Sequence, residues 1–258
     1  MKNIALLICT LPLLTACATS PLGRSQLTLM SDDEVNTMGV QAFAQMKEKQ
    51  PASNNKTDND FVNCVARALL KEVGGDWEVV VFEDESFNAF ALPGSKIGVH
   101  TGLVSLVDNA DQLAAVIGHE IGHVQAHHGN ERMSQEMAVQ QGLSITQAIF
   151  SPTSALGQSA MSALGLGYGV VLPFSRLHES EADIIGLRLM AQAGFNPRES
   201  VNLWIKMGQA SEGQNLPEFM STHPTSSTRI KDLEKNMPQA LQTQQAAITA
   251  GKRLDCVK

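Results

Sequence analysis

Apolar residues recur with helical spacing across the middle of the chain. Residues 113–117, Ile121 and Val124 are apolar, and the polar residues Asn109 and Asp111 precede them in the manner of a helix start. The pattern predicts a capped helix that begins near residue 110 and has one buried side.

β-branched and aromatic residues upstream of this helix predict a small sheet. Residues 77–82 form one expected strand, and residues 89–92 and 97–100 form an expected hairpin around the turn Pro93-Gly94. We therefore expect a single α+β domain, mainly helical, with a small β-sheet next to the central helix.

Further helical patterns follow the central helix. They cover residues 175–186 and 200–207 and are separated by a break at residues 194–197. Residues 142–172 are rich in Gly, Ala, Ser and Met, and polar residues interrupt them too often for a membrane span of about 20 residues. Their small residues favour a close-packed helical pair, and a mobile flap over a cleft at the central helix is the alternative.

Composition and charge restrict the class of protein. The chain is 43% hydrophobic and 17% charged, as is usual for a folded globular protein. Its net charge of -7 and its pI near 5.5 argue against nucleic acid as a partner, and no stripe of basic residues contradicts this.

The first residues have the features of a secretory signal. Residues 1–16 carry one positive charge and a short apolar core, and they end before Cys17 in a Leu-Thr-Ala-Cys sequence that resembles the bacterial lipoprotein box. That resemblance implies cleavage before Cys17 and acylation of its thiol. Since Ala18 is not an aspartate, the Gram-negative sorting rule implies an outer-membrane lipoprotein that faces the periplasm.

This interpretation divides the chain into three parts. We expect a signal peptide over residues 1–16, a lipidated tether over residues 17–30 and a folded domain over residues 31–258. An ordinary signal peptide and a retained membrane anchor are the alternatives.

The remaining cysteines then form a pair. Removal of the signal and lipidation of Cys17 leave Cys64 and Cys256 in an oxidising compartment. We expect a disulfide between them, and two free buried thiols are the alternative.

The central helix contains residues with the spacing of metal ligands. His119 and His123 are four residues apart and therefore share a helix face, and Glu120 follows the first histidine. Two neutral imidazoles supply two of the three protein ligands of a catalytic zinc, and the glutamate reaches water at the metal without being a ligand. The motif predicts a hydrolytic site for one Zn²⁺ ion, and two histidines on a packed helix face are the alternative.

Two more histidines follow the motif. We interpret His127 and His128 as residues of the last helical turn before a helix-ending Gly129, where imidazoles satisfy free carbonyl groups. A direct role of either histidine in metal binding is the alternative.

The third ligand is expected from the 175–186 helix. Glu179 and Asp183 share one face, whereas Glu181 lies roughly opposite both. We expect Glu179 to bind the metal, Asp183 to orient a histidine, and Glu181 to face solvent or form a salt bridge. An ordinary acidic helix surface is the alternative.

These residues resemble the gluzincin metallopeptidases of family M48. The resemblance covers about residues 30–235 and rests on the following segments: Asn88-Ala89-Phe90 with Pro93-Gly94, Gly102-Leu103-Val104, His119 to His123, Glu179 to Asp183, and Thr222-His223-Pro224 with Arg229. It implies a zincin-like fold with Glu179 as the third zinc ligand and Asp183 as the support of a metal-binding histidine.

The resemblance also implies roles for residues outside the zinc helix. Asn88, Ala89 and Phe90 occupy the place of an edge strand that binds substrate by strand addition. In related enzymes a histidine equivalent to His223 occupies the fourth zinc position in a resting state; a surface-loop histidine is the alternative here. Transition-state stabilisation needs a further donor, and we consider His223, Arg229 and Tyr168 for this role.

The function expected from these features is that of a zinc metalloendopeptidase of the bacterial cell envelope. Its expected substrates are misfolded or unassembled periplasmic and outer-membrane proteins, and its lipid anchors it to the outer membrane. One alternative is a chaperone-like factor that works with the outer-membrane protein assembly machinery and has a peptidase held latent by His223. A non-catalytic zinc-binding lipoprotein is another.

Overall fold

A short hairpin and two long helices begin the described part of the chain. The computed structural model describes residues 17–150, 174–210, 219, 222, 223, 227–252 and 255–258. The first elements are β1 (Cys17–Thr19), β2 (Ser25–Leu27), α1 (Asp32–Lys49) and α2 (Lys56–Val73). The tether expected over residues 17–30 thus contains an antiparallel pair of strands, in which Cys17 pairs with Leu27.

The predicted sheet is present and has three strands. They are β3 (Glu78–Phe82), β4 (Ala89–Leu92) and β5 (Lys96–His100), in the order β3-β5-β4. β4 and β5 are antiparallel and form the hairpin expected around Pro93-Gly94, where Gly94 has a φ of +81° that L side chains rarely adopt. β4 is therefore an edge strand of this sheet.

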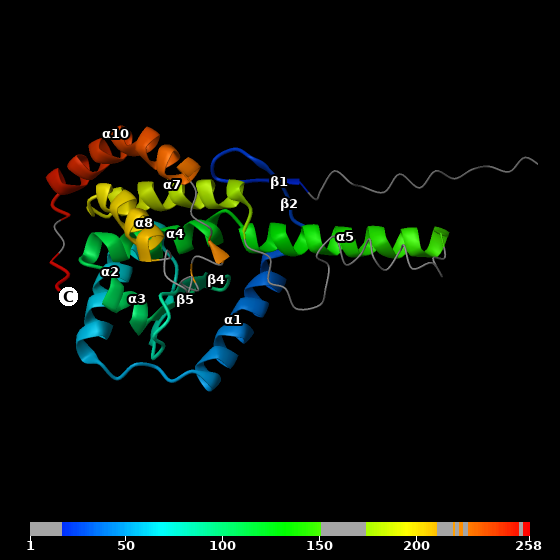
Figure 1. Ribbon diagram of the computed structural model, residues 1–258, viewed down its shortest axis with the longest axis horizontal. Helices are drawn as coiled ribbons and strands as arrows, with labels where there is room; N and C mark the ends of the chain where they lie inside the picture. Colours follow the sequence, from blue (N-terminus) through cyan, green and yellow to red (C-terminus); the bar gives the residue numbers. More distant parts are fainter. Residues whose placement is uncertain (1–16, 151–173, 211–218, 220–221, 224–226, 253–254) are drawn as a thin grey trace, which may run out of the picture.

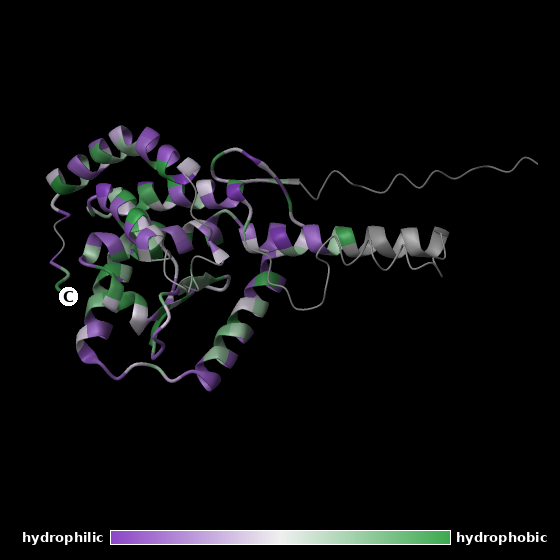
Figure 2. Ribbon diagram, in the orientation of Figure 1, coloured by the Kyte–Doolittle hydropathy of each residue, from purple (hydrophilic) through white to green (hydrophobic). Residues whose placement is uncertain are grey.

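Helices make up the rest of the described domain, which confirms the expected mainly helical α+β class. They are α3 (Thr101–Leu106), α4 (Ala110–Gln125), α5 (His128–Phe150), α7 (Arg176–Gln192), α8 (Arg198–Ala210) and α10 (Ser227–Thr249). Figure 1 shows α4 and α7 side by side in the middle of the molecule, with α10 beyond α7 and α5 projecting outwards. Along α10, hydrophobic and hydrophilic residues alternate, as on a helix with one buried face (Figure 2).

The central helix α4 begins where the sequence predicts but ends earlier. The Asn109 side chain accepts a hydrogen bond from the Gln112 backbone N–H at 2.9 Å and so caps the helix start. At the other end, His127 has a φ of 51°, and α5 starts directly after it. The prediction of a helix end at Gly129 is therefore wrong, because His127 adopts the left-handed conformation and Gly129 lies inside α5.

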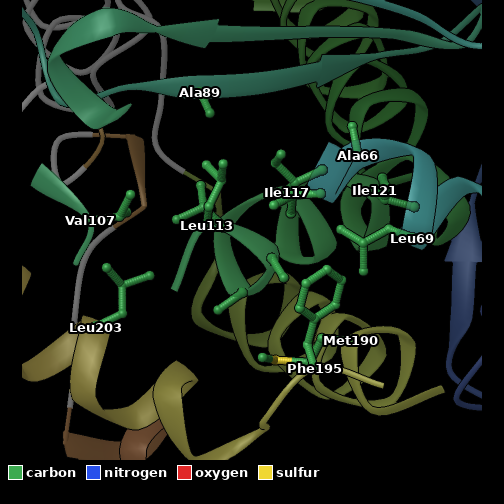
Figure 3. Close-up of a cluster of buried hydrophobic side chains, with 14 of the residues drawn as sticks. Ala66, Leu69, Ala89, Val107, Leu113, Ile117, Ile121, Met190, Phe195 and Leu203 are labelled. Atoms are coloured by element: carbon green, nitrogen blue, oxygen red, sulfur yellow. The ribbon is translucent and has the colours of Figure 1, made fainter. Parts of the chain in front are cut away.

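The core surrounds α4. Figure 3 shows Leu113, Ile117 and Ile121 of this helix packed among side chains of α2, β4, α7 and α8. All three side chains are fully buried. A helix that is buried over most of its surface is a rigid support for the two histidines that it carries.

Some sequence predictions fall only partly on the described residues. Residues 142–150 belong to α5, whereas residues 151–172 lie outside the described part of the chain, and so does the signal peptide. Among the described helices, none is both long enough and apolar enough to cross a membrane.

A disulfide joins Cys64 on α2 to Cys256 near the C-terminus, over a sequence separation of 192 residues. This is the pair expected from the sequence.

Replacing both cysteines by serine is expected to lower the free energy of unfolding by about 2–5 kcal/mol, because the crosslink restricts the unfolded chain. Chemical unfolding of the oxidised wild type and of the double variant measures the difference. Reductant should weaken the wild type alone; equal stabilities would contradict the prediction.

Candidate metal centre

Four buried side chains converge on one point between α4, α7 and the segment that contains His223. Potential ligand atoms of His119, His123, Glu179 and His223 all lie within 4.8 Å of one another. Each residue is at most 4% exposed. The structure thus brings together the three ligands expected from the sequence and adds His223, which is buried and not a surface-loop residue.

Close packing of α4 on α7 creates this convergence. A Cβ atom on Gly122 would lie 2.8 Å from the Ala182 carbonyl oxygen, and one on Gly186 would lie 2.7 Å from the His119 backbone nitrogen. Side chains at either position would push the helices apart. The two glycines therefore allow the histidine face of α4 to contact the carboxylate face of α7.

The donor atoms have the spacing of ligands around a small cation. His119 Nε2 lies 3.1 Å from His123 Nε2 and 3.3 Å from His223 Nδ1, and Glu179 Oε1 lies 3.0 Å from His223 Nδ1. Ligands at zinc–nitrogen distances of 2.0–2.1 Å in a tetrahedral site are about 3.3 Å apart. Imidazole and carboxylate donors at this spacing fit a zinc ion.

Two carboxylates make this point favourable for positive charge. His119 Nδ1 is 2.9 Å from Asp183 Oδ1, and His119 Nε2 is 3.4 Å from Glu179 Oε2. Burial by itself lowers the pKa of His119, but these carboxylates outweigh burial and raise it to about 9. A metal cation at the same point would satisfy the same carboxylates.

Asp183 contacts His119, as the supporting role expected for it requires, and Arg229 contacts two carboxylates. Arg229 Nε and Nη2 donate to the two oxygens of Asp183 at 2.6 and 2.8 Å. Arg229 Nη1 is 2.9 Å from Glu179 Oε2. The guanidinium also lies over the Trp204 ring, 3.9 Å from its centroid. Burial would raise the pKa of Asp183, but Arg229 and His119 hold it below its usual value. In this structure the Arg229 guanidinium therefore contacts the carboxylates of Asp183 and Glu179, and its role as a donor to an oxyanion stays a prediction. Tyr168, the third donor considered, lies outside the described residues.

Glu120 lies beside the donor cluster without belonging to it. Its Oε1 atom is buried, has no hydrogen-bond partner among the described residues and is 3.5 Å from His223 Nε2. Burial raises its pKa, although a backbone hydrogen bond from Ala91 of β4 opposes this effect. A buried carboxylate with an unused oxygen next to a metal site is suited to accept a proton.

The expected substrate strand lies next to Glu120. Ala89 is buried, and the Phe90 ring packs against Phe43, Phe82 and His100. Ala89 therefore belongs to the core and the half-buried Phe90 ring packs against other rings, so the backbone of β4 is the part that an extended peptide would contact.

An open cavity connects this strand with the metal centre. It has a volume of about 380 Å³, and its mainly apolar lining includes Val35, Met38, Ala91, Leu92, His123 and Phe174. The cavity lies between α1, β4 and the end of α4, so a peptide alongside β4 would reach the histidines.

The structure separates the two histidines that follow the motif. His127 is half exposed and 3.4 Å from Asp32, outside the donor cluster, whereas His128 is fully buried beside His123. Glu181 forms a salt bridge with Arg24, which is one of the two outcomes expected for it. Sequence spacing gave no signal for the contact of His128 with His123, because that contact depends on the left-handed turn at His127.

The Glu179 carboxylate is the only acidic ligand in the described cluster, and Glu179→Gln removes its charge with little change in shape. We expect the variant to bind Zn²⁺ at least about 100-fold more weakly, since loss of an outer-shell partner alone costs 10–100-fold. Competition with a chromogenic chelator measures the affinity, with exposed Glu234→Gln as the matched control. Wild-type affinity in Glu179→Gln would exclude Glu179 as a ligand.

Comparisons with known proteins agree with this geometry. Residues 51–237 match the model of peptidase family M48, and this range contains all four residues of the donor cluster. The mitochondrial metalloendopeptidase OMA1 of Schizosaccharomyces pombe is 41% identical over 167 residues, which cover 64% of this chain and 48% of the relative.

Two other relatives align over most of the chain. The mitochondrial metalloendopeptidase OMA1 of Bos taurus is 34% identical, with 85% of this chain and 45% of the relative covered. The beta-barrel assembly-enhancing protease of Escherichia coli strain K12 is 26% identical, with 84% of this chain and 47% of the relative covered. The chain spans about half the length of these curated relatives. The match over most of the chain, together with the convergence of the expected ligands, shows that this chain belongs to peptidase family M48 and has its zincin-like fold.

Proposed function

We propose that this chain is a zinc-dependent endopeptidase of the bacterial cell envelope that cleaves misfolded or unassembled periplasmic and outer-membrane proteins. The observation that carries the proposal is the buried donor set of His119, His123 and Glu179 beside the unused oxygen of Glu120. Relatives named as metalloendopeptidases support peptide-bond hydrolysis.

The residues of the site divide the chemistry among them. A zinc ion held by His119, His123 and Glu179 would act as a Lewis acid on a peptide carbonyl and on water. Glu120 accepts the proton of the attacking water and returns it to the departing amine, so one carboxylate serves as base and then as acid. Arg229 and Asp183 keep the His119 ring in its orientation meanwhile.

Unfolded segments are the substrates that this site favours. β4 offers a backbone edge, and the adjoining cavity is mainly apolar and wide enough for side chains. A folded protein hides both its backbone hydrogen-bonding groups and its apolar side chains, whereas a misfolded protein exposes them. This selectivity for unfolded chains suits an enzyme that removes damaged proteins.

An envelope location has separate support. The lipoprotein-like sequence before Cys17, the Cys64–Cys256 disulfide and the similarity to the beta-barrel assembly-enhancing protease are all consistent with the periplasm. We therefore place the chain with the periplasmic lipoprotein proteases of the family, such as LoiP, whose sequence pattern it resembles. The mitochondrial relatives show that the same peptidase unit also occurs elsewhere.

The position of His223 favours one alternative. With His223 Nδ1 among the donor atoms, the site offers four protein ligands, whereas a catalytic zinc site keeps one position open. His223 must therefore move before a substrate carbonyl can approach. A chaperone-like assembly factor with a latent peptidase is the second candidate function.

Glu120→Gln tests the catalytic proposal. We expect the variant to keep its metal and to lose hydrolysis of fluorescently labelled unfolded casein by about 10²–10⁴-fold, since the amide cannot accept the proton. Glu120→Gln is introduced both into the wild-type chain and into His223→Ala, in which the latent site is open. Glu136→Gln on the exposed surface of α5 is the control. Metal-loaded chains that never cleave casein would favour the non-catalytic alternatives.

Cys17→Ser tests the location. When the full chain is expressed in a Gram-negative host with labelled palmitate, we expect label in the outer-membrane fraction of the wild type and of Cys64→Ser. Cys17→Ser should carry no label, because the acylated thiol is gone. An unlabelled wild type, or a labelled Cys17→Ser, would contradict the lipoprotein assignment.

A further inference from the structure

A second cluster of buried polar residues lies directly behind the metal centre. His128 and Glu131 from α5, His178 and Glu181 from α7, and Ser20 next to β1 are all at most 5% exposed. None of them belongs to the donor set described above, so their burial calls for another explanation.

His128 connects this cluster to a metal ligand. Its Nδ1 lies 3.0 Å from Nδ1 of His123, the ring nitrogen that faces away from the donor atoms. Its Nε2 lies 3.2 Å from Glu181 Oε2. The His128 ring therefore bridges a carboxylate on α7 and a ligand on α4.

The hydrogen-bond network determines where the protons lie. Glu181 Oε2 already accepts a hydrogen bond from Arg24 Nε, so His128 Nε2 is the donor in its contact with this oxygen. In the His128 tautomer that has its proton on Nε2, Nδ1 accepts, and His123 Nδ1 is the donor of the pair. In that tautomer the lone pair of His123 Nε2 is directed to the metal position.

Two residues of the N-terminal segment bind the Glu181 carboxylate. Arg24 Nε donates to Glu181 Oε2 at 3.0 Å, and the Ser20 hydroxyl donates to Glu181 Oε1. Arg24 also binds both oxygens of Glu131, at 2.7 and 2.6 Å. The arginine thus links the α5 and α7 carboxylates to the segment that directly follows Cys17.

Two further contacts fix His128 and the end of α4. His178 stacks on the His128 ring with centroids 4.4 Å apart and reaches Glu131 at 3.1 Å. Gln26 of β2 donates to the carbonyl oxygen of Ala126, just beyond the last turn of α4, at 2.6 Å. The hairpin therefore supports both the ring that contacts His123 and the helix that carries it.

From these contacts we infer that His128 is the positioning residue of His123, and that Glu181 with Arg24 and Ser20 of the N-terminal segment sets its orientation. His119 is oriented directly by Asp183, whereas His123 is oriented by Glu181 through a second imidazole. The inference rests on the metal-binding role of His123 in the proposed function. It makes the segment next to the expected lipid anchor part of the metal centre.

A matched pair of amides at position 128 tests the inference. His128→Asn would place the amide oxygen of the new side chain near the position of His128 Nδ1 and keep the acceptor for His123. His128→Gln would place its amide near Nε2, where it contacts Glu181 but offers His123 no acceptor. His127→Asn is the control, since asparagine tolerates the left-handed conformation of this half-exposed position.

We expect His128→Gln to bind Zn²⁺ about 10–100-fold more weakly than the wild type and to shift the visible absorption bands of bound Co²⁺. His128→Asn should restore most of the affinity and the wild-type spectrum, and His127→Asn should change neither. Wild-type behaviour of His128→Gln, or equal losses in both amide variants, would overturn the inference.

If the amide variants do not fold, nitrogen-15 NMR of the zinc-loaded wild type with labelled histidines shows which ring nitrogens of His123 and His128 carry a proton. His123 must then show a protonated Nδ1 and His128 an unprotonated one; a proton on His128 Nδ1 overturns the inference. A wild-type chain that binds no Zn²⁺ refutes the proposed function itself, whereas a zinc-bound wild type with the other tautomer refutes only the role of His128.

Discussion

The contact between α4 and α7 is the constraint on which the site depends. The two histidines of α4 need a carboxylate from another element, and that carboxylate must come within about 3.5 Å of both rings. Gly122 and Gly186 permit this approach because their backbones already touch the facing helix. The distances between the two histidines of α4 and Glu179 follow from this packing, and the burial of α4 on its other sides keeps it fixed.

The close approach brings charges into the interior, and the surrounding residues balance them. Glu179, Asp183 and Arg229 are all buried, and the guanidinium contacts both carboxylates. Removing one partner of such a group would leave an uncompensated charge in a medium of low polarity, which is strongly destabilising. One positive and two negative charges leave an excess of negative charge in these three residues, which a metal cation at the donor cluster would balance. The same electrostatics therefore serve both the stability of the helix pair and the affinity for the ion.

Residues outside the two central helices determine what the site can do. His223, from the segment that precedes α10, stands among the donors, and the β1–β2 hairpin supports the far side of His123 through Glu181 and His128. One of these contacts occupies the approach of a substrate, whereas the other fixes the orientation of a ligand. The segment that directly follows Cys17 is thus linked by side-chain contacts to the metal centre.

The sequence by itself determined what local periodicity controls. Asn109 as a helix cap, the shared face of His119 and His123, the shared face of Glu179 and Asp183, and the turn at Pro93-Gly94 all follow from spacing over four residues or fewer. The ligand set could be proposed because the resemblance to a family related distant motifs to one another. The tertiary structure alone decided the contacts of Arg229 and His128, the folding of residues 17–27 into a hairpin, and the end of α4 at the left-handed His127. The contacts of Arg229 with Asp183 and of His128 with Glu181 join residues far apart in the chain, as does that of Arg24 with Glu181, and no periodic pattern encodes which distant charge a buried side chain will meet.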